Sequence, residues 1–499
     1  MSVQLAVTSG IRTTTKSRLI HSTLFACLVF LPRTPVAFAA SPNSSGQTKH
    51  NILLVFVDDM GWGDFSCFGN REVTTQSIDR LAAEGIRFEQ FYVNSPICSP
   101  SRVAISTGQY PTRWRITSYL NNRKSNNDRG IAQWLDLKAP MLARMLNDAG
   151  YATGHFGKWH MGGQRDVGEA PLITEYGFDK SLTNFEGLGP RVLALKDAYD
   201  GKKPKRHTLG SDTLGRGEIT WEDRSLVTER FTAAALNFVR DSQAAGKPFY
   251  INLWPDDVHS PFFPPAARRG DGTKRTLYHG VLDTMDEQLG VLFDYIRRDK
   301  QLRDNTLILV CSDNGPEQGA GSAGKFRGLK TMLFEGGVRS SLVVWGPGLI
   351  PKDRAGFVNR TSVFSAIDLV PSLLRITGVE APAGTEFDGE PLPDVLLGKS
   401  TASRRKPLFF RRPPDRDRFY GVDDLPDLAV RDGKWKLLCE YDGTDRLLFD
   451  LESDSKESTN VAAEHPAVAD RLSDAVVKWN ASMPADNGAT FKPKPRRRK

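Results

Sequence analysis

Two short, almost uninterrupted apolar runs constrain the fold of this chain more than any other feature. Residues 50–57 read HNILLVFV and residues 306–311 read TLILVC, and each run ends directly before a group of polar residues. Runs of this length without polar alternation are typical of strands that are buried on both faces of a parallel sheet. Such a sheet needs helices on both faces, so we expect an α/β sandwich.

The rest of the chain agrees with a large mixed, mostly parallel sheet up to about residue 395. Apolar periodicity predicts helices over 77–84, 141–149, 228–242, 277–298 and 365–377, and further strands over 152–156, 248–253 and 341–345. Beyond residue 395 the pattern changes to short strands joined by Asp-Gly turns, at 428–430, 435–439 and 446–450, with a helix over 466–479. We therefore predict one large domain over 40–395 and a small α+β subdomain with an antiparallel sheet over 396–485.

The N-terminus has the pattern of a secretory signal peptide. Three basic residues between positions 12 and 18 precede the apolar run 24–31, and Ala-Phe-Ala at 37–39 has the form of a cleavage site. The run is shorter than the roughly 20 residues of a membrane span. We expect residues 1–39 to be removed and the protein to be exported to the periplasm or the extracellular space, without stable membrane insertion. Cys27 lies in a sequence that loosely resembles a lipobox, but the apolar stretch that follows it argues against lipid anchoring.

The net charge of +8 comes from the two ends of the chain. Residues 1–39 hold four basic residues and no acidic ones, and residues 492–499 hold six basic residues, so the part between them carries −2. A basic pI of this origin does not indicate a nucleic-acid-binding surface. Residues 486–499 are predicted to form a disordered basic tail.

Five cysteines are too few and too scattered for a disulfide scaffold. Removal of the signal peptide leaves Cys67, Cys98, Cys311 and Cys439. We expect mostly buried single thiols, and a Cys67–Cys439 bridge stays open at this point.

Polar side chains follow both apolar runs. Asp58 and Asp59 come directly after the first run, and Asp313 and Asn314 follow the second. Acidic pairs at strand ends are common in loops, but ligands bind at the carboxyl ends of parallel strands, where two such pairs can meet. Their oxygen atoms suit Ca²⁺ or Mg²⁺ better than a metal that prefers sulfur or imidazole.

Two longer motifs give the chain a family resemblance. Residues 96–102 read PICSPSR and lead to Thr-Gly at 107–108, and residues 150–160 read GYATGHFGKWH. Both resemble the signatures of type I sulfatases, which are arylsulfatase-like members of the alkaline phosphatase superfamily. Further matching segments occur in the family's order at 51–61, 258–261, 312–315, 327–330 and 335–337. The resemblance covers nearly all of the chain beyond the signal peptide, and it implies that 40–395 is the catalytic domain.

The resemblance implies a modified nucleophile. In this family the motif cysteine, here Cys98, is oxidised to Cα-formylglycine by a formylglycine-generating enzyme, which would be a maturation partner. The hydrated aldehyde attacks the sulfur of a sulfate monoester and later expels sulfate, so one difficult step is split into two. The resemblance further implies one Ca²⁺, in preference to Mg²⁺, held by Asp58, Asp59, Asp313 and Asn314 and touching residue 98.

The resemblance also assigns roles to basic residues. Arg102 would orient the nucleophile, Lys158 would bind the sulfate, and His160 would be the base of the elimination step. His259, together with Lys330, would protonate the leaving alcohol. The remaining histidines considered are expected to be structural: His155, His207, His279 and His465.

The substrate class implied is an organic sulfate monoester. A sulfated saccharide is expected because an exported enzyme meets extracellular polysaccharides, and segments 184–224, 262–274 and 411–420 are candidates for specificity. Two alternatives stay open: a phosphonate or phosphodiester hydrolase of the same superfamily, and a catalytically silent carbohydrate-binding relative. Two-metal phosphatases of the superfamily carry a histidine where this chain has Asn314, which favours a sulfatase. The sugar, the ester position and the choice between exo and endo action are not determined by the sequence.

Overall fold

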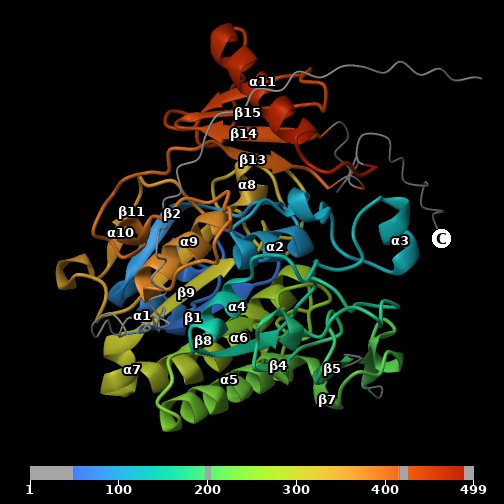
Figure 1. The fold of residues 1–499 in the computed structure, drawn as a ribbon, viewed down its shortest axis with the longest axis vertical. Helices are drawn as coiled ribbons and strands as arrows, with labels where there is room; N and C mark the ends of the chain where they lie inside the picture. The colour runs from blue at the N-terminus through green and yellow to red at the C-terminus, as the bar shows by residue number, and fades with distance from the viewer. Residues whose placement is uncertain (1–48, 197–203, 414, 416–424, 488–499) are drawn as a thin grey trace, which may run out of the picture. The chain divides into compact units, whose positions relative to one another are not determined.

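The computed structural model describes residues 49–196, 204–413, 415 and 425–487. The predicted signal peptide and residues 488–499 of the predicted tail lie outside these ranges. The main feature is a nine-stranded sheet with strand order β11-β2-β10-β9-β1-β8-β3-β4, in which β12 also pairs with β2 (Figure 1). Its strands are β1 (Asn51–Val57), β2 (Ile86–Tyr92), β3 (Ala152–Gly157), β4 (Lys180–Leu182), β8 (Phe249–Trp254), β9 (Thr306–Ser312), β10 (Arg339–Trp345), β11 (Phe357–Asn359) and β12 (Phe364–Ser365). Strand β10 is antiparallel to both of its neighbours and the other pairs are parallel, as predicted.

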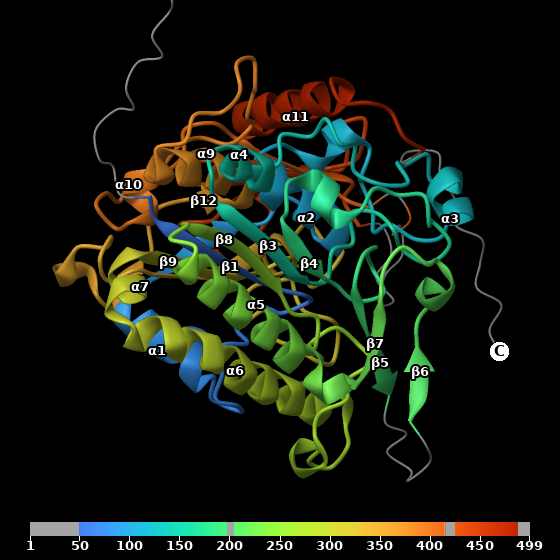
Figure 2. The same cartoon turned by 60° about the horizontal axis from the view of Figure 1, so that its bottom comes forward.

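Helices cover both faces of this sheet (Figure 2). One face packs against α1 (Gln76–Glu84), α5 (Val227–Ala244) and α6 (Lys274–Arg298), and the other against α2 (Cys98–Thr107), α4 (Leu142–Asp148) and α9 (Ala366–Thr377). Shorter helices are α3 (Arg123–Asp128), α7 (Lys300–Asn305), α8 (Glu335–Val338) and α10 (Pro393–Leu396). The predicted α/β sandwich is confirmed.

The alternation of side chains along β1 explains its apolar run. Ile52, Leu54 and Phe56 belong to the core shared with α2, α4 and α9. Leu53 and Val55 point the other way, into the core shared with α1, α5 and α6. Each such side chain contributes about 1.5–3 kcal/mol when fully buried, so a polar residue at any of these positions would destabilise one core or the other. The strand is thereby fixed, and so is the position of the residues that follow it.

A second, antiparallel sheet lies in the C-terminal part. Its strands are β13 (Leu408–Arg411), β14 (Leu428–Asp432), β15 (Trp435–Cys439) and β16 (Leu447–Asp450), in that order, and α11 (Pro466–Ala481) covers one face. Phe410 and Leu438 on the other face share a core with Ala104 of α2 and Ile367 of α9. Helix α2 is therefore enclosed between the two sheets, and all ten of its residues are buried. The boundary between residues 395 and 396 stays a prediction.

A third sheet was not predicted from the sequence. It contains β5 (Arg191–Lys196), β6 (Lys205–His207) and β7 (Ile219–Asp223), with β5 in the middle. The sequence analysis also missed β2, β4, β11, β12 and β13. Strand β6 reads Lys-Arg-His and is largely exposed, so it carries no apolar pattern by which a strand could be recognised.

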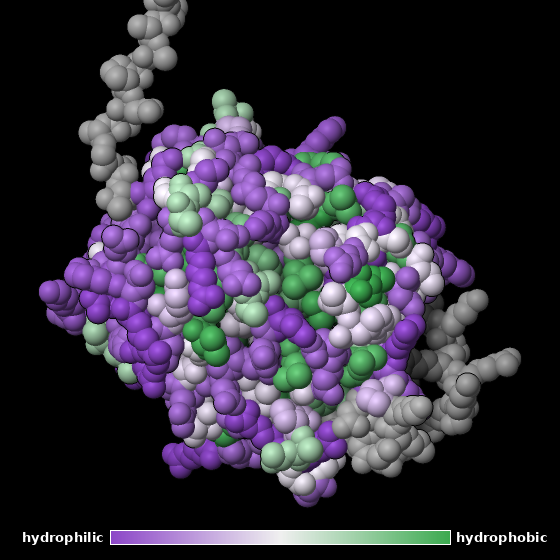
Figure 3. All heavy atoms as spheres, turned by 90° about the horizontal axis from the view of Figure 1, so that it is seen from below, coloured by the Kyte–Doolittle hydropathy of each residue, from purple (hydrophilic) through white to green (hydrophobic). Residues whose placement is uncertain are grey.

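The four cysteines in the described residues are free thiols, so the Cys67–Cys439 bridge left open above is not formed. Hydrophilic side chains predominate on the face shown in Figure 3, with hydrophobic residues in small areas between them. None of the helices in the described ranges has the length and apolar character of a membrane span.

His155 behaves as a structural histidine, as predicted. It is buried on β3, with its ring 5.1 Å from that of Trp159 and 5.0 Å from that of Trp254. Burial lowers the pKa of His155 from 6.5 to about 3. Between these values the unfolded chain binds one proton more than the folded protein, so the free energy of unfolding falls as the pH falls.

We expect the variant His155→Gln to weaken this pH dependence. From pH 6 to pH 5 one titrating group contributes up to about 1.4 kcal/mol to the change in the free energy of unfolding. Between pH 6 and pH 5, the free energy of unfolding of the wild type should therefore fall by up to about 1.4 kcal/mol more than that of the variant. Urea denaturation at the two pH values measures this difference. His465→Gln, at an exposed histidine, is the control and should keep the wild-type slope. If wild type and His155→Gln lost equal stability between pH 6 and pH 5, the assignment of this pH dependence to His155 would be contradicted.

Candidate active site

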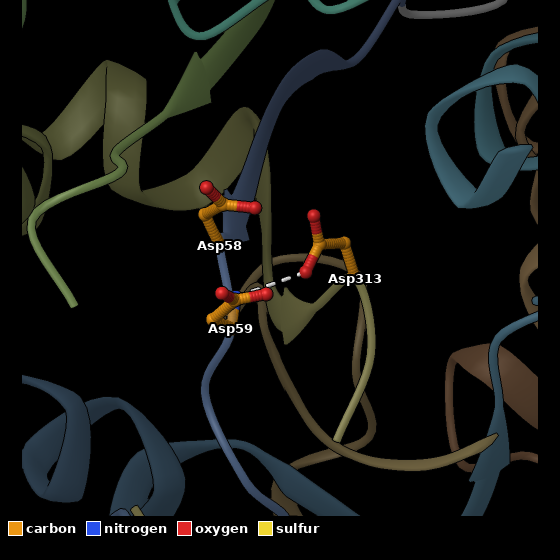
Figure 4. Close-up of side chains that lie close together, drawn as sticks. All are labelled: Asp58, Asp59 and Asp313. Atoms are coloured by element: carbon orange, nitrogen blue, oxygen red, sulfur yellow. Dashed lines mark hydrogen bonds between the residues drawn. The ribbon is translucent and has the colours of Figure 1, made fainter. Parts of the chain in front are cut away.

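Strands β1 and β9 bring the two acidic pairs together. They are parallel neighbours with Val57 opposite Ser312, so the residues that follow them leave the sheet side by side. Oxygens of Asp58, Asp59 and Asp313 all lie within 4.8 Å of one another (Figure 4). The Asp59 backbone N–H donates to Asp313 Oδ1 at 3.0 Å. The expectation that both pairs meet at one edge of the sheet agrees with this geometry.

Asn314 completes a set of oxygen atoms. Its Nδ2 donates to Asp59 Oδ1 at 2.8 Å, and its Oδ1 is buried without a hydrogen-bond partner. Burial and the neighbouring Asp58 carboxylate raise the pKa of Asp313 well above its usual value. An unpartnered buried acceptor beside three crowded carboxylates fits a hard divalent cation, which takes oxygen ligands. These four residues could therefore hold such an ion.

Cys98 is the first residue of α2, and the loop before it is held by buried hydrogen bonds. Ser101 Oγ donates to the Ser95 carbonyl at 2.7 Å, and Ser99 Oγ accepts from the Leu120 N–H at 2.9 Å. The Thr331 N–H donates to the Pro96 carbonyl at 2.7 Å. A proline at the third position of the helix is tolerated because its missing N–H has no partner in the first turn. The motif serines thus fix the place of residue 98.

Burial makes the unmodified Cys98 thiol unreactive. The side chain is 3% exposed, and burial raises its pKa to about 11, although the charges of Lys158 and Lys330 oppose this shift. The thiol is therefore neutral at physiological pH, and a neutral thiol is a poor nucleophile. This environment does not suit a catalytic cysteine that acts through its sulfur.

Three cations surround the carboxylates. Arg102 Nη2 lies 3.0 Å from Asp58 Oδ1 and 2.8 Å from Asp313 Oδ2, so one guanidinium bridges the two strand ends. Lys158 Nζ donates to Asp58 Oδ2 at 2.6 Å, and Lys330 Nζ donates to Asp59. These pairs raise the pKa of both lysines in spite of their burial, so both ammonium groups are charged.

Close backbone packing positions Lys158. Gly157, at the end of β3, has φ of 123°, and a Cβ there would lie 2.1 Å from the Trp254 carbonyl oxygen. Only glycine fits this left-handed position. Strand β3 can therefore approach β8 closely enough for the Lys158 N–H to donate to the same carbonyl at 2.9 Å.

The two motif histidines differ in their surroundings. His160 is buried, and its Nε2 lies 2.9 Å from the Leu120 carbonyl oxygen and 3.2 Å from Glu186 Oε2. Burial and the charge of Lys158 lower its pKa well below 6.5, so the ring is neutral and can accept a proton. His259 is one-third exposed, and its Nε2 lies 3.5 Å from Asp59 Oδ2. Burial lowers the pKa of His259 as well, while Asp59 favours its protonated form.

Backbone strain is concentrated here. Asp59, His160 and Thr331 have φ of 59°, 54° and 74°, a region that residues other than glycine rarely adopt. Such positions are often found at active sites, where the surrounding structure holds them in place.

A central pocket, of about 490 Å³, is lined by five of the predicted site residues. Cys98, Lys158, His160, His259 and Lys330 line it. Arg102, Asp58, Asp59, Asp313 and Asn314 lie buried around it, each 0–1% exposed. The structure thus brings every predicted site residue into one region.

Several lining residues were not predicted individually. Segment 184–224 contributes Phe185, Glu186, Lys196, His207, Leu209 and Arg224. His207, which was expected to be structural, therefore faces the pocket. Segment 262–274 and the described part of 411–420 contribute none of its lining residues. The sequence marked 184–224 only as a basic, glycine-containing segment, and no motif distinguished Glu186 or Arg224.

Arg224 belongs to a buried polar group beside the central pocket. Its Nη1 lies 3.2 Å from Asp256 Oδ1, and Asn184 Nδ2 donates to Asp256 Oδ2 at 2.7 Å. Asp256 follows β8, the neighbour of β1, which places it at the same edge of the sheet as the carboxylate cluster. A carboxylate held in this way presents fixed acceptors to hydroxyl groups in the pocket.

Comparisons with known proteins agree on one family. The profile of the Sulfatase family matches residues 50–379. N-acetylgalactosamine-6-sulfatase from Sus scrofa is 32% identical over 72% of this chain and 68% of its own length. N-acetylgalactosamine-6-O-sulfatase from Bacteroides thetaiotaomicron is 28% identical over 87% of this chain and 93% of its own length. The solved structure of Ps i-CgsB in complex with k-i-k-neocarrahexaose is similar, with a TM-score of 0.72, 25% identity, and coverage of 90% of this chain and 96% of that one.

A parallel sheet that gathers oxygen ligands and cations at the carboxyl ends of its strands is suited to the hydrolysis of anionic esters. The chain belongs to the Sulfatase family and is a sulfuric ester hydrolase. The resemblance found in the sequence motifs is thereby confirmed.

Proposed function

We propose that the protein is an exported sulfatase that removes sulfate from sulfated carbohydrates, with a formylglycine made from Cys98 and one bound Ca²⁺. The observation that carries this proposal is the position of Cys98. It begins a buried helix, it lines a pocket together with Lys158 and Lys330, and the charges of Asp58 and Asp313 act on it. A formylglycine-generating enzyme would be needed during maturation, because the unmodified thiol cannot supply the oxygen nucleophile of the proposed reaction.

The metal would be held by Asp58, Asp59, Asp313 and Asn314, with residue 98 as a further ligand. Ca²⁺ is favoured over Mg²⁺ because it accepts many protein oxygens in flexible geometry, whereas Mg²⁺ keeps several waters. When bound, the ion supplies Lewis-acid polarisation of a sulfuryl oxygen. The three carboxylates are already matched by Arg102, Lys158 and Lys330, so an added divalent ion gives the site a positive charge that favours an anionic substrate.

Each residue of the site would have a separate role in the reaction. Formylglycine supplies, as its hydrate, the oxygen nucleophile that the Cys98 thiol cannot provide. Lys158 binds the sulfate group, and Arg102, fixed between two carboxylates, orients residue 98. The neutral His160 takes a proton in the elimination step, and His259 with Lys330 delivers a proton to the leaving alcohol oxygen.

A sulfated saccharide is the proposed substrate class. The curated relatives are named for N-acetylgalactosamine 6-sulfate, and the similar solved structure holds a neocarrahexaose. The wall of the central pocket offers carboxylates at Glu186 and Asp256 for sugar hydroxyls and aromatic rings at Tyr119 and Phe185 for sugar faces. The first substrates to test are therefore N-acetylgalactosamine 6-sulfate and its 4-sulfate isomer, alone and within oligosaccharides.

Discrimination between sulfate and phosphate tests the reaction class. We expect the matured enzyme to release sulfate from 4-nitrophenyl sulfate at a kcat/KM at least about 100-fold above that for 4-nitrophenyl phosphate, a difference of about 2.7 kcal/mol. A phosphate monoester carries nearly two negative charges at neutral pH and a sulfate monoester one. The site has Asn314 where a two-metal phosphatase has histidine, so it lacks the second metal ligand that would neutralise the extra charge.

The matched measurement uses the same preparation with phenyl phosphonate esters. Mass spectrometry of the peptide around residue 98 must first show the thiol converted to the aldehyde. Comparable rates for sulfate and phosphorus esters would overturn the sulfatase assignment in favour of a phosphorus ester hydrolase. Full conversion to the aldehyde without release of either group would point to the silent carbohydrate-binding alternative.

A further inference from the structure

A second pocket, of about 510 Å³, lies where the C-terminal sheet meets strands β2 and β10 of the large sheet. We call it the basic pocket; its walls come from β2, β10, β14 and segments 360–363, 403–408 and 451–455. Figure 1 shows the C-terminal sheet above β2, and Arg431 of β14 bonds Tyr92 of β2. The described residues that line it include none of those that line the central pocket.

The basic pocket has a marked excess of positive charge. Eight of its lining residues are lysine or arginine, and two are glutamate. Four of the eight have a carboxylate partner: Arg339 with Glu335 at 3.0 Å, Arg360 with Glu89 at 3.4 Å, Arg404 with Asp368 at 3.1 Å and Lys434 with Asp450 at 2.6 Å. The side chains of the other four, Lys325, Arg405, Lys406 and Arg431, form no ion pair among the described residues. The Glu390 carboxylate accepts hydrogen bonds from the Arg405 and Lys406 backbone N–H groups, at 3.0 and 2.6 Å. Glu452 on the pocket wall and Glu390 beside residues 405 and 406 balance part of these four charges, so the pocket keeps an excess of positive charge.

Arg431 is the central residue of this group. It is 5% exposed, and its guanidinium donates to neutral acceptors: Tyr92 Oη, Gln90 Oε1 at 2.5 Å and the Gly433 carbonyl at 3.3 Å. Burial lowers the pKa of Arg431 to about 9, although the charges of Glu452 and Glu457 oppose this shift. A buried cation whose charge is only partly compensated costs free energy, and an anion bound in the pocket would offset this cost.

The form of the pocket suits an oxyanion group on a polar carrier. Arg431 is fixed at the wall, while Lys325, Arg405 and Lys406 are exposed at the opening and can follow an approaching anion. A guanidinium group can bind two oxygens of a sulfate or phosphate group through paired N–H donors. The hydroxyls of Thr361 and Ser455 also line the pocket and offer hydrogen bonds to a sugar.

We propose that the basic pocket is a non-catalytic binding site for a sulfate group on a saccharide chain. The oxyanion chemistry follows from the charges of the pocket, and the saccharide carrier rests on the proposed function. A polymer bound there would be retained on the enzyme while other sulfate groups reach the central pocket, so the site would raise affinity for long substrates without affecting small ones.

Binding is tested in the Cys98→Ala background, where the ligand is not consumed. The probes are dextran sulfate oligosaccharides, unsulfated dextran of the same length and inorganic sulfate, measured by isothermal titration calorimetry. Arg405→Gln/Lys406→Gln removes two exposed charges of the pocket, and Arg71→Gln/Lys138→Gln removes two exposed charges elsewhere as the matched control. Arg431→Gln is the third variant, with circular dichroism to verify folding.

We expect the Arg405→Gln/Lys406→Gln protein to bind dextran sulfate at least fivefold more weakly, with a smaller salt dependence, and Arg431→Gln to show a similar loss. The control should bind like the background, and unsulfated dextran should not bind. Unchanged affinity in Arg405→Gln/Lys406→Gln, or an equal loss in the control, would overturn the proposal. Binding of inorganic sulfate as tightly as dextran sulfate would overturn the saccharide assignment.

Turnover separates this proposal from the proposed function. With residue 98 intact and matured, Arg405→Gln/Lys406→Gln should hydrolyse 4-nitrophenyl sulfate at the wild-type kcat/KM. An enzyme that is inactive on aryl sulfates but binds dextran sulfate through these residues would refute the proposed function alone.

Discussion

Cys98→Ala is expected to lower kcat for 4-nitrophenyl sulfate by roughly 10⁵-fold or more, the order of magnitude that follows the loss of a covalent nucleophile. Alanine cannot be converted to the aldehyde, so the variant lacks the oxygen nucleophile proposed for residue 98. The measurement is sulfate release by wild type and variant, both produced with the formylglycine-generating enzyme.

Cys439→Ala is the matched control. Cys439 is also fully buried, but it lies on β15 in the C-terminal sheet, so both variants lose a sulfur atom from a packed interior. We expect Cys439→Ala to retain near wild-type kcat, even where its midpoint of thermal unfolding falls. Activity of Cys98→Ala within tenfold of the wild type, in a folded preparation, would contradict the assignment of the nucleophile.

Five strands of the large sheet, β1, β3, β8, β9 and β10, could be predicted because their apolar sequences reflect their burial. The apolar runs at 50–57 and 306–311 became β1 (Asn51–Val57) and β9 (Thr306–Ser312), within one residue at each end. Full burial on both faces removes the need for polar alternation, and the polar residues that follow mark the carboxyl edge. The position of the acidic pairs followed from this reasoning alone, whereas the roles of Cys98 and the motif lysines came from the family resemblance.

The wall of the central pocket could not be predicted in the same way. Glu186 and Arg224 are ordinary polar residues in a segment without apolar periodicity. The His160 N–H donates to the Glu186 carbonyl, and Arg224 directly follows β7, which pairs with β5, so contacts distant in the sequence position both. The left-handed backbone at Asp59, His160 and Thr331 is imposed by tertiary contacts, such as the Thr331 N–H bond to Pro96, that local sequence does not encode. The basic pocket depends in the same way on contact between two sheets far apart in the chain.

Asp313→Asn is expected to abolish the response to Ca²⁺. One carboxylate oxygen in the cluster becomes an amide nitrogen, which cannot bind the ion, so affinity should fall by more than the roughly 10–100-fold that follows outer-shell changes. In the wild type, Ca²⁺ at 100 times its Kd should stabilise the fold by about 2.7 kcal/mol. The readouts are the shift of the unfolding midpoint on adding Ca²⁺ to chelator-treated protein, and sulfate release, which should fall at least about 10³-fold.

Asp64→Asn distinguishes loss of the metal from general damage to the site. Asp64 follows β1 by seven residues and is fully buried, and burial raises its pKa to about 7, so an amide replaces a carboxyl that is already partly neutral. Its carboxylate accepts hydrogen bonds from Gly61, Ser322 and Tyr278 rather than joining the three-carboxylate cluster. We therefore expect Asp64→Asn to lower stability by about 1–3 kcal/mol yet to keep the full Ca²⁺-dependent shift. If Asp313→Asn kept that shift, or if Asp64→Asn lost it as well, the four residues after β1 and β9 would not be the metal site.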